Sequence, residues 1–267
     1  TLMRLTRVNV LNTARSLEIA VEQNATKYFA VSSDKAANPF NMMGASKRIM
    51  EMYLASRGGG VAVSTARFAN VAFSNGSLLD GFRYRLVKRQ PLAAPSDVRR
   101  YLVTEEEAGR LCLLSIILGT DKEIFFPKAP SELHLVSFAD VAKRFLRARG
   151  YEPYLCRSED EAREYLKDND GSRRWPLFVF ESDTTGEKPF EEFYTSEEEV
   201  DWRRFEELGV IKNTLTTEKA HLDSFSSRIN ELLTRGEWTK EDLVEAYSKL
   251  LPHFSHRELS RSLDQRQ

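Results

Sequence analysis

The sequence predicts an α/β fold in which helices cover both faces of a parallel sheet. Through the first two thirds of the chain, short apolar runs typical of buried strands alternate with longer stretches that carry apolar residues at helical spacing. Such alternation is typical of βαβ units, whose crossover helices cover the sheet. With 267 residues the chain is long enough for one large domain or two small ones, and so for a sizeable core.

The predicted elements of the first part follow one another closely. Residues 8–23 carry apolar side chains at helical spacing, and "YFAVS" at 28–32 indicates a short buried strand. A helix is predicted from Met43 to Ser56, ended by the three glycines at 58–60. The next elements are a strand at 61–68, a helix within 76–90, a short strand at 99–103, a helix from Thr104, a strand at 123–128 and a helix at 137–150.

From residue 151 the alternation loosens. Strands predicted at 151–156 and 175–182 flank a charged helix at 158–168. The stretch 215–251 is helical, and its two apolar stripes are expected to be core or a docking surface and not a cofactor site. We therefore divide the chain into residues 1–150, 151–214 and 215–267.

Composition and charge exclude several classes of protein. A formal net charge of -1 gives no general attraction to nucleic acid or to an anionic membrane. The longest uncharged apolar run, residues 111–119, is far shorter than the ~20 residues that span a bilayer. Two cysteines and an N-terminus without a signal-peptide pattern indicate a cytoplasmic protein without a disulfide framework. No metal site is predicted.

Positive charge gathers in "FRYRLVKRQ" and "DVRR". A solvated helix face is the simpler interpretation of these stretches, and a site for a phosphate-bearing ligand is the alternative. The basic residues concerned are Arg83, Arg85, Lys88, Arg89, Arg99 and Arg100.

Polar residues stand where two of the predicted strands end. Ser33, Asp34 and Lys35 follow the strand at 28–32, and Asn70 follows the strand at 61–68. In open α/β sheets, ligands bind beyond the carboxyl ends of the strands. These residues are therefore candidates for a binding or catalytic site.

Met43 and Lys47 lie four residues apart at the start of a predicted helix. Their side chains share one face of that helix and can point at the same strand end. A lysine there can hydrogen-bond a ribose or lower the pKa of a neighbouring hydroxyl, whereas an ordinary surface lysine is the alternative.

The stretch "SSDKAANPFNMMGASK" at 32–47 resembles a motif of the extended short-chain dehydrogenase/reductase superfamily, and within it of the CapD-like nucleotide-sugar 4,6-dehydratases of polysaccharide biosynthesis that act on N-acetylglucosamine nucleotides. The match continues in "ARFANVAFSNGSLL", "DVRRYLVT", "EIFFPKAPS" and "GEKPFEEF". "PHFSHRELSRSLDQRQ" is similar to the branch associated with legionaminic-acid-type sugars. The resemblance implies a Rossmann-like sheet whose C-terminal half lies in 1–150, with a substrate-binding part in 151–214 and a helical segment in 215–267.

The resemblance also implies a reaction. Such a dehydratase oxidises C4 of the sugar by hydride transfer to bound NAD or NADP, removes water from C5 and C6, and returns the hydride to C6. The loss of water needs a base for the C5 proton and an acid for the departing hydroxyl. By resemblance Asp34 is the acid and Lys35 is the base. An uncharged aspartic acid and an uncharged lysine are not the usual states at neutral pH. Either the two side chains exchange a proton, or burial beside the ligand shifts both of their pKa values.

Oxidation at C4 needs a further base, which in most of the superfamily is a tyrosine four residues before the lysine. That position is Met43 here, and a methionine cannot accept a proton. Some long members of this dehydratase group also have methionine there. Ser33, Asp34, Lys47 or a water could accept the C4 proton, and we favour Lys47 acting through Ser33 or water.

The glycine-rich fingerprint that binds a dinucleotide is absent from the sequence, because the glycines of "RGGGVAV" precede a strand and do not open a helix. The resemblance therefore implies that the chain begins near the middle of the nucleotide-binding domain. It retains mainly the groups for the nicotinamide side, namely Lys47, Phe68 and Asn70. On its own it is expected to bind NAD(P) weakly.

The resemblance also places candidate substrate contacts, and Asn70 is one of them. The turn from Ser74 to Ser77 could offer backbone N–H groups to a diphosphate near a helix N-terminus, with a plain helix cap as the alternative. Arg100 and Lys188 are candidate phosphate contacts. The family commonly has arginine ahead of "GEK", where this chain has Thr184.

Three functions follow from these observations. The first is dehydration of UDP- or GDP-N-acetylglucosamine, and the second is 4-epimerisation of a nucleotide sugar, which needs no acid and base for water loss. The third is a noncatalytic module on a degenerate fold, favoured by Met43 and the missing glycine loop but opposed by the joint presence of the other site residues. Superfamily members usually pair through helices, so a homo-oligomer is expected, with the helix from Met43 as a candidate surface.

Overall fold

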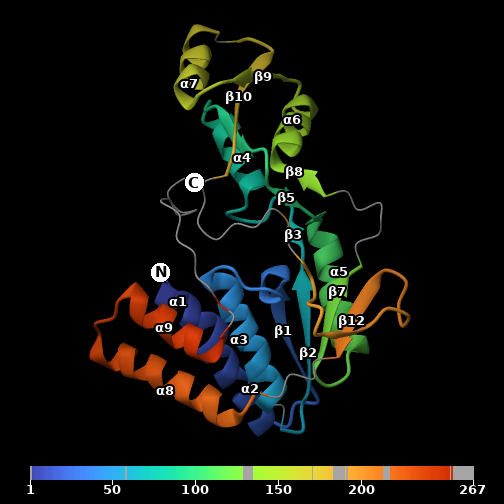
Figure 1. Ribbon diagram of the computed structural model, residues 1–267. Helices are drawn as coiled ribbons and strands as arrows, with labels where there is room; N and C mark the ends of the chain where they lie inside the picture. Colours follow the sequence, from blue (N-terminus) through green and yellow to red (C-terminus); the bar gives the residue numbers. More distant parts are fainter. Residues whose placement is uncertain are drawn as a thin grey trace. The chain divides into compact units, whose positions relative to one another are not determined.

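The computed structural model describes residues 2–57, 59–128, 135–169, 171–182, 190, 192–212, 217–252 and 254 (Figure 1). They form two compact units. The larger unit is drawn from Thr1–Phe68, Glu106–Pro130 and Glu192–Arg257, and the described part of the smaller unit lies within Ala69–Glu105 and Ser131–Glu191. The three consecutive parts inferred from the sequence divide the chain at other points, and that division stays a prediction.

The larger unit is built on a five-stranded sheet with the order β1-β2-β7-β12-β11. The first three strands are parallel, as predicted, and the last two continue the sheet in antiparallel pairing. Ser33 pairs with Phe68 in the register of β1 and β2, so the carboxyl ends of these strands lie side by side. The strands are β1 Lys27–Ser33, β2 Ala62–Phe68, β7 Glu123–Pro127, β12 Leu208–Lys212 and β11 Glu199–Asp201.

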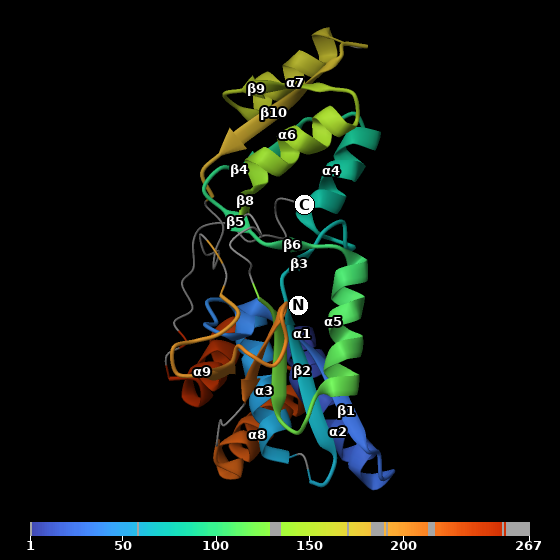
Figure 2. The same ribbon diagram turned by 90° about the vertical axis from the view of Figure 1, so that its right-hand side faces the viewer.

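Helices cover both faces of this sheet, as the alternating pattern predicted. Successive side chains of a strand point to opposite faces. Tyr28 and Val63 accordingly pack with residues of α2 and α3, whereas Ala66 and Phe125 pack with Leu111 of α5. Figure 2 shows α5 on one side of the sheet and α3 on the other. The bounds are α2 Asn12–Glu22, α3 Met42–Arg57 and α5 Glu105–Leu118.

The two C-terminal helices pack on α3, which confirms that their apolar stripes form core. The buried residues of these stripes include Leu222 and Ile229 of α8 and Leu243 of α9. Because α3 is enclosed by elements of its own unit, the prediction that it offers an oligomer surface is wrong. The other elements around it are α1 Leu2–Thr6, the π-helical η1 Arg7–Leu11, α8 Lys219–Arg235 and α9 Lys240–Leu250.

The smaller unit contains a parallel three-stranded sheet with the order β4-β10-β9. The predicted strand, helix and strand between residues 151 and 182 are confirmed as β9, α7 and β10. Leu79, Phe82, Phe145 and Leu146 belong to the core that α4 and α6 form with this sheet. The bounds are β4 Leu92–Pro95, β9 Glu152–Cys156, β10 Arg174–Phe180, α4 Leu78–Val87, α6 Phe138–Ala148 and α7 Glu159–Asp168.

The single strand predicted at 99–103 is two short strands with different partners. β5 (Arg99–Arg100) pairs antiparallel with β8 (Val136–Ser137), and β6 (Leu102–Val103) pairs parallel with β3 (Asn70–Val71). The change of partner at Tyr101 interrupts the strand, which residue propensity alone does not reveal. Within the described part of the chain, no helix is both long and apolar enough to cross a membrane.

Candidate active site

The acid and the base inferred from the sequence are in direct contact at the end of β1. The Nζ of Lys35 lies 3.2 Å from Oδ1 of Asp34, whose side chain is only 4% exposed, against 21% for Lys35. The same Oδ1 accepts hydrogen bonds from the Ser33 hydroxyl at 2.8 Å and from the Lys35 backbone N–H at 2.9 Å. Three donors therefore converge on one oxygen of a buried carboxylate, which fixes the position of this side chain.

Local backbone geometry holds these residues together. Ser33 is extended and its hydroxyl oxygen accepts the Lys35 N–H at 3.2 Å, which caps the 3-10 turn η2 (Asp34–Ala36). The start of α3 packs on this turn so closely that a Cβ on Gly44 would lie 2.4 Å from the Lys35 carbonyl oxygen. Asn41 accepts the Gly44 N–H at 2.9 Å, a bond that satisfies one of the first-turn donors of the helix. The sequence interpretation did not single out Asn41 and Gly44.

Lys47 reaches the same strand from α3. Its Nζ donates a hydrogen bond of 2.8 Å to the carbonyl oxygen of Val31, two residues before Ser33. Burial lowers the pKa of Lys47, and the nearby Glu51 carboxylate partly opposes that effect. The predicted approach of Lys47 to the end of the strand is confirmed, and its ammonium is easier to deprotonate than that of a surface lysine.

Met43 and Phe68 frame this strand end. Met43 is half-buried in the first turn of α3, where its carbonyl oxygen accepts a hydrogen bond of 2.7 Å from Ser46. Phe68 is half-buried at the end of β2, beside Ser33 in the sheet register. Both residues thus belong to the same edge of the sheet as Asp34 and Lys35.

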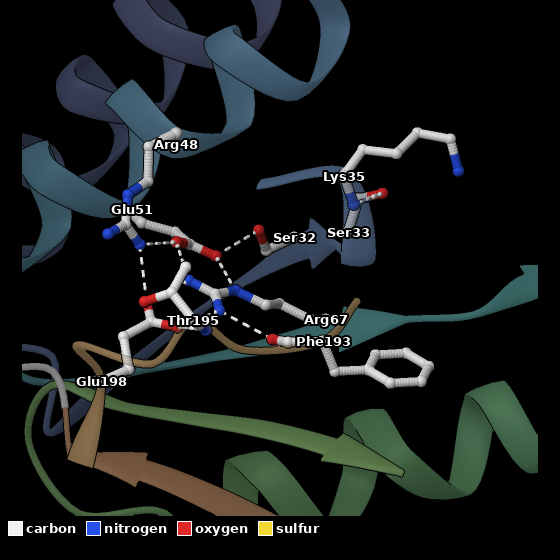
Figure 3. A network of polar contacts seen from close by, with 9 residues as sticks. All are labelled: Ser32, Ser33, Lys35, Arg48, Glu51, Arg67, Phe193, Thr195 and Glu198. Atoms are coloured by element: carbon white, nitrogen blue, oxygen red, sulfur yellow. Dashed lines mark hydrogen bonds and ion pairs between the residues drawn. The ribbon is translucent and has the colours of Figure 1, made fainter. Parts of the chain in front are cut away.

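A network of buried charges lies beside Ser32, the residue before Ser33 (Figure 3). The guanidinium of Arg67 in β2 donates to both oxygens of Glu51 in α3, at 2.9 and 2.7 Å. It also donates to both oxygens of Glu198, at 2.8 and 2.7 Å. The Ser32 hydroxyl donates to Glu51 at 2.6 Å, and Arg48 contacts Glu198 at 2.7 Å. The network therefore links β1, β2, α3 and the segment before β11.

Opposite charges decide the ionisation of this network. Burial alone would raise the pKa of Glu198, but hydrogen bonds and charges from Arg67 and Arg48 outweigh it and lower the pKa to about 2. Burial likewise opposes the charge of Arg67, yet Glu51 and Glu198 raise its pKa. Arg67 and Glu198 therefore stay charged although the Arg67 side chain is fully enclosed.

The segment 192–198 contacts both the network and the loop that follows the turn η2. The Phe193 carbonyl accepts a hydrogen bond of 2.7 Å from Arg67, and Glu198 accepts the Thr195 N–H at 2.9 Å. Glu192 accepts a bond of 2.8 Å from the side chain of Asn38. The sequence contained one sign of this arrangement, because an arginine inside the apolar strand 61–68 needs a buried carboxylate partner.

In the smaller unit, Asn70 lies in β3, two residues after the end of β2. Its backbone N–H donates to the Tyr101 carbonyl at 3.1 Å. Its side-chain Nδ2 is enclosed and donates to none of the described residues. Buried amide donors are nearly always satisfied, so this one is suited to a ligand.

The remaining predicted contacts have structural partners. Ser77 caps α4 by accepting the Asp80 N–H at 3.2 Å, and the Ser74 hydroxyl donates to the Val71 carbonyl at 2.9 Å. Arg100 is buried in β5 and donates to the Arg99 carbonyl at 2.8 Å. Binding of substrate by these residues stays a prediction. Lys188 and Thr184 lie outside the described residues.

Comparison with known proteins identifies the family of the chain and several relatives. A family model described as "Polysaccharide biosynthesis protein" matches residues 1–213. An uncharacterised membrane protein of Methanocaldococcus jannaschii is 32% identical over 159 residues, covering 55% of this chain and 46% of that protein. The capsular polysaccharide biosynthesis protein CapD of Staphylococcus aureus is 29% identical over 192 residues, covering 70% and 31%. Proteins called UDP-glucose 4-epimerase from Rickettsia species also match.

The fold is also found in a solved structure. The X-ray structure of Pen from Bacillus thuringiensis superposes with a TM-score of 0.60 at 21% identity, covering 78% of this chain and 59% of that one. At this identity the likeness establishes the fold alone. The chain spans less than half the length of the two curated relatives described above.

Proposed function

Because the chain belongs to the polysaccharide biosynthesis protein family, we propose that it carries the acid and the base of a nucleotide-sugar 4,6-dehydratase. The substrate would be UDP- or GDP-N-acetylglucosamine and the product the 4-keto-6-deoxy sugar, for the synthesis of surface glycans in the cytoplasm. The resemblance to the branch for legionaminic-acid-type sugars belongs to the same proposal.

The observation that carries the proposal is the contact between Asp34 and Lys35. Water loss needs a proton acceptor and a proton donor at adjacent carbons, and the two groups lie 3.2 Å apart. Movement of one proton from the Lys35 ammonium to Oδ1 of Asp34 gives a neutral amine and a carboxylic acid. The charged pair is then the state after water loss, and the neutral pair the state before it.

The step balances with these two residues alone. The neutral amine of Lys35 takes the C5 proton, and the electrons of the C5–H bond form the double bond between C5 and C6. The C6–O bond breaks as Asp34 gives its proton to the departing hydroxyl, which leaves as water. Lys35 ends as the ammonium and Asp34 as the carboxylate, so the ion pair is restored.

The residues at the strand end suit the nicotinamide side of a dinucleotide. Lys47 is fixed on the Val31 carbonyl, and Asn70 carries an enclosed amide donor without a partner among the described residues. Lys47 and Phe68 of the larger unit would hold that side of NAD or NADP, and Asn70 of the smaller unit is a candidate contact in its own right. Bound NAD(P) would supply the oxidation of C4 and the reduction of C6.

For the proton released at C4 we propose Lys47 as the final acceptor, acting through water or Ser33. Its lowered pKa favours a neutral amine. The Ser33 hydroxyl donates a hydrogen bond to Asp34, so a proton taken up by Ser33 could also pass to the Asp34 carboxylate. Met43 has no acceptor group in either path.

The test is the mass of the product. The protein expressed from its complete gene is incubated with UDP- or GDP-N-acetylglucosamine, and the expected product is lighter than the substrate by one water. The variants Asp34→Asn and Lys35→Met should form this product much more slowly than the parent or not at all. Loss of product with retained binding of the nucleotide sugar would locate the defect in chemistry.

An epimerase is the second candidate, because several relatives are called UDP-glucose 4-epimerase. Epimerisation at C4 changes no mass and leaves the C5 proton in place. A product of unchanged mass that differs only at C4 would select this function. Conversion of neither nucleotide sugar would favour a noncatalytic module.

A further inference from the structure

One face of α3 packs against the end of β1, beside the proposed acid and base. Gly44, Lys47 and Glu51 share this face because they stand three and four positions apart. Gly44 lies so close to the Lys35 carbonyl oxygen that a side chain would not fit, and the Lys47 Nζ donates to the Val31 carbonyl at 2.8 Å. The position of α3 relative to β1 therefore determines where the Lys47 amine lies.

Glu51 joins this face of α3 to β1 by a hydrogen bond between side chains. Its Oε1 accepts the Ser32 hydroxyl at 2.6 Å, and both residues are buried (Figure 3). This distance is near the short end of the range for O–H···O bonds, which is about 2.5 to 3.0 Å. The bond therefore holds the strand and the helix at a defined separation.

Arg67 fixes Glu51 from the neighbouring strand β2. Its guanidinium donates to both oxygens of Glu51, at 2.9 and 2.7 Å, and this two-point contact defines the orientation of the side chain. A buried ion pair contributes little net stability compared with apolar packing of the same volume. Its presence next to the end of β1 therefore favours a role in fixing geometry.

Lys47 needs such a fixed frame because its side chain is flexible. Four carbons separate the Nζ from the backbone, so a hydrogen bond to one carbonyl does not by itself define where the amine lies. Position matters for catalysis, because a misplacement of about 1 Å can lower a rate by about 100-fold. A serine hydroxyl that holds the strand against the helix can thus contribute to catalysis without touching the substrate.

We propose that Ser32 is a positioning residue for proton transfer. Its bond to Glu51 holds α3 and β1 in the register that keeps the Lys47 amine at the end of the strand. This inference rests on the proposed function, in which Lys47 is the final acceptor of the C4 proton. The Ser32 hydroxyl itself neither takes nor gives a proton in that reaction.

Ser32→Ala tests the proposal, and Ser64→Ala is the matched control. Both serines are buried in neighbouring strands, and the Ser64 hydroxyl donates to the Ser115 carbonyl at 2.8 Å. In each variant the acceptor keeps a second donor, so neither substitution leaves a buried acceptor without a hydrogen bond. The midpoints of thermal unfolding should therefore fall by a similar few degrees.

The kinetic effects should differ between the two variants. In the protein expressed from its complete gene, Ser32→Ala should lower kcat for dehydration by about 10- to 100-fold, with KM within about twofold of the parent. Ser64→Ala should keep both parameters. Ser32→Cys has nearly the volume of serine but a weaker donor, and its kcat should lie between those of the parent and Ser32→Ala.

Acetylation of lysine amines, followed by mass spectrometry, reports on Lys47 without any substrate. In the parent the amine is held on the Val31 carbonyl, which should slow its reaction. Ser32→Ala should release the amine and raise its acetylation rate severalfold, whereas Ser64→Ala should leave that rate unchanged. This measurement separates the positioning of Lys47 from the proposed reaction.

The contrary results are distinct. A kcat of Ser32→Ala equal to that of Ser64→Ala would overturn the role in catalysis, even if Lys47 became more reactive. An unchanged acetylation rate of Lys47 in Ser32→Ala would overturn the positioning of the amine. A parent protein that forms no dehydrated product would refute the proposed function instead, and the acetylation rates would then decide whether Ser32 positions Lys47.

Discussion

The guanidinium of Arg67 and the carboxylate of Glu51 form a bidentate pair, with contacts of 2.9 and 2.7 Å, and neither side chain reaches solvent. Glu51 also accepts a hydrogen bond from the hydroxyl of Ser32, two residues before the turn η2. The strand end that carries Asp34 and Lys35, the proposed acid and base, is thus linked through Ser32 to a buried ion pair that does not itself contact them. This link leads to predictions for stability as well as for catalysis.

Arg67→Met should lower the free energy of unfolding by about 3–5 kcal/mol, because it leaves Glu51 and Glu198 buried without their main partner. Urea unfolding followed by circular dichroism measures the change. Lys212→Met, which removes one partner of the exposed pair with Glu199, is the matched control and should change little. An Arg67→Met protein with the urea midpoint of the parent would show that the network does not stabilise the fold.

Glu198 should make stability dependent on acid pH. Its pKa is about 2 in the folded chain against an ordinary value of 4.5, so the folded state binds this proton less readily than the unfolded state. The resulting stability, on the order of 3 kcal/mol, is present above pH 4.5 and is lost as the pH falls towards about 2. Glu198→Gln should be less stable at pH 7 and should lose less stability across this range. Equal slopes for both proteins in urea unfolding at pH 2.5 to 6 would exclude this role.

Much of the fold was predictable because buried parallel strands leave continuous apolar runs. β1, β2 and β7 all appear in this way in the sequence. β4 was not predicted, because "LAAP" is short and ends in proline. β11 and β12 were not predicted either. They are short, with three and five residues, and they pair antiparallel, so no helix between them marks them as part of the alternating strand and helix pattern.

The candidate site was predictable only where its residues are neighbours in the chain. Ser33, Asp34 and Lys35 are consecutive, so a motif of a few residues places them together. The partners of Arg67 stand 16 and 131 positions away, and only folding brings them together. The buried charge of Arg67 was visible in the sequence, whereas the identity of its partners was not.

Met43→Tyr should leave turnover intact or raise it. The half-buried position lies in the first turn of α3, four residues before Lys47, and a phenol there adds an acceptor for the C4 proton. Steady-state rates with the nucleotide sugar measure the effect, and Met43→Phe is the control that adds a ring without the hydroxyl. Complete loss of turnover in Met43→Tyr alone would show that a hydroxyl at this place obstructs the reaction.

Asn70→Ala should weaken ligand binding without destabilising the fold. The side-chain Nδ2 is enclosed and donates to no residue in the described ranges, so its removal breaks no hydrogen bond of the protein at that atom. KM for the nucleotide sugar, or Kd for NAD(P), should rise while the thermal midpoint stays within a few degrees. A lower midpoint with unchanged KM and Kd would make Asn70 a structural residue.

Deuterium uptake at C5 of the sugar tests most directly whether Asp34 and Lys35 divide the elimination between them. In D2O the parent should give a 4-keto-6-deoxy product with deuterium at C5, and Lys35→Met should give neither the label nor the product. Asp34→Asn should still exchange the C5 proton but lose water slower by about 10²–10⁴-fold. Formation of the C5-labelled product by Lys35→Met at the parent rate would contradict the account.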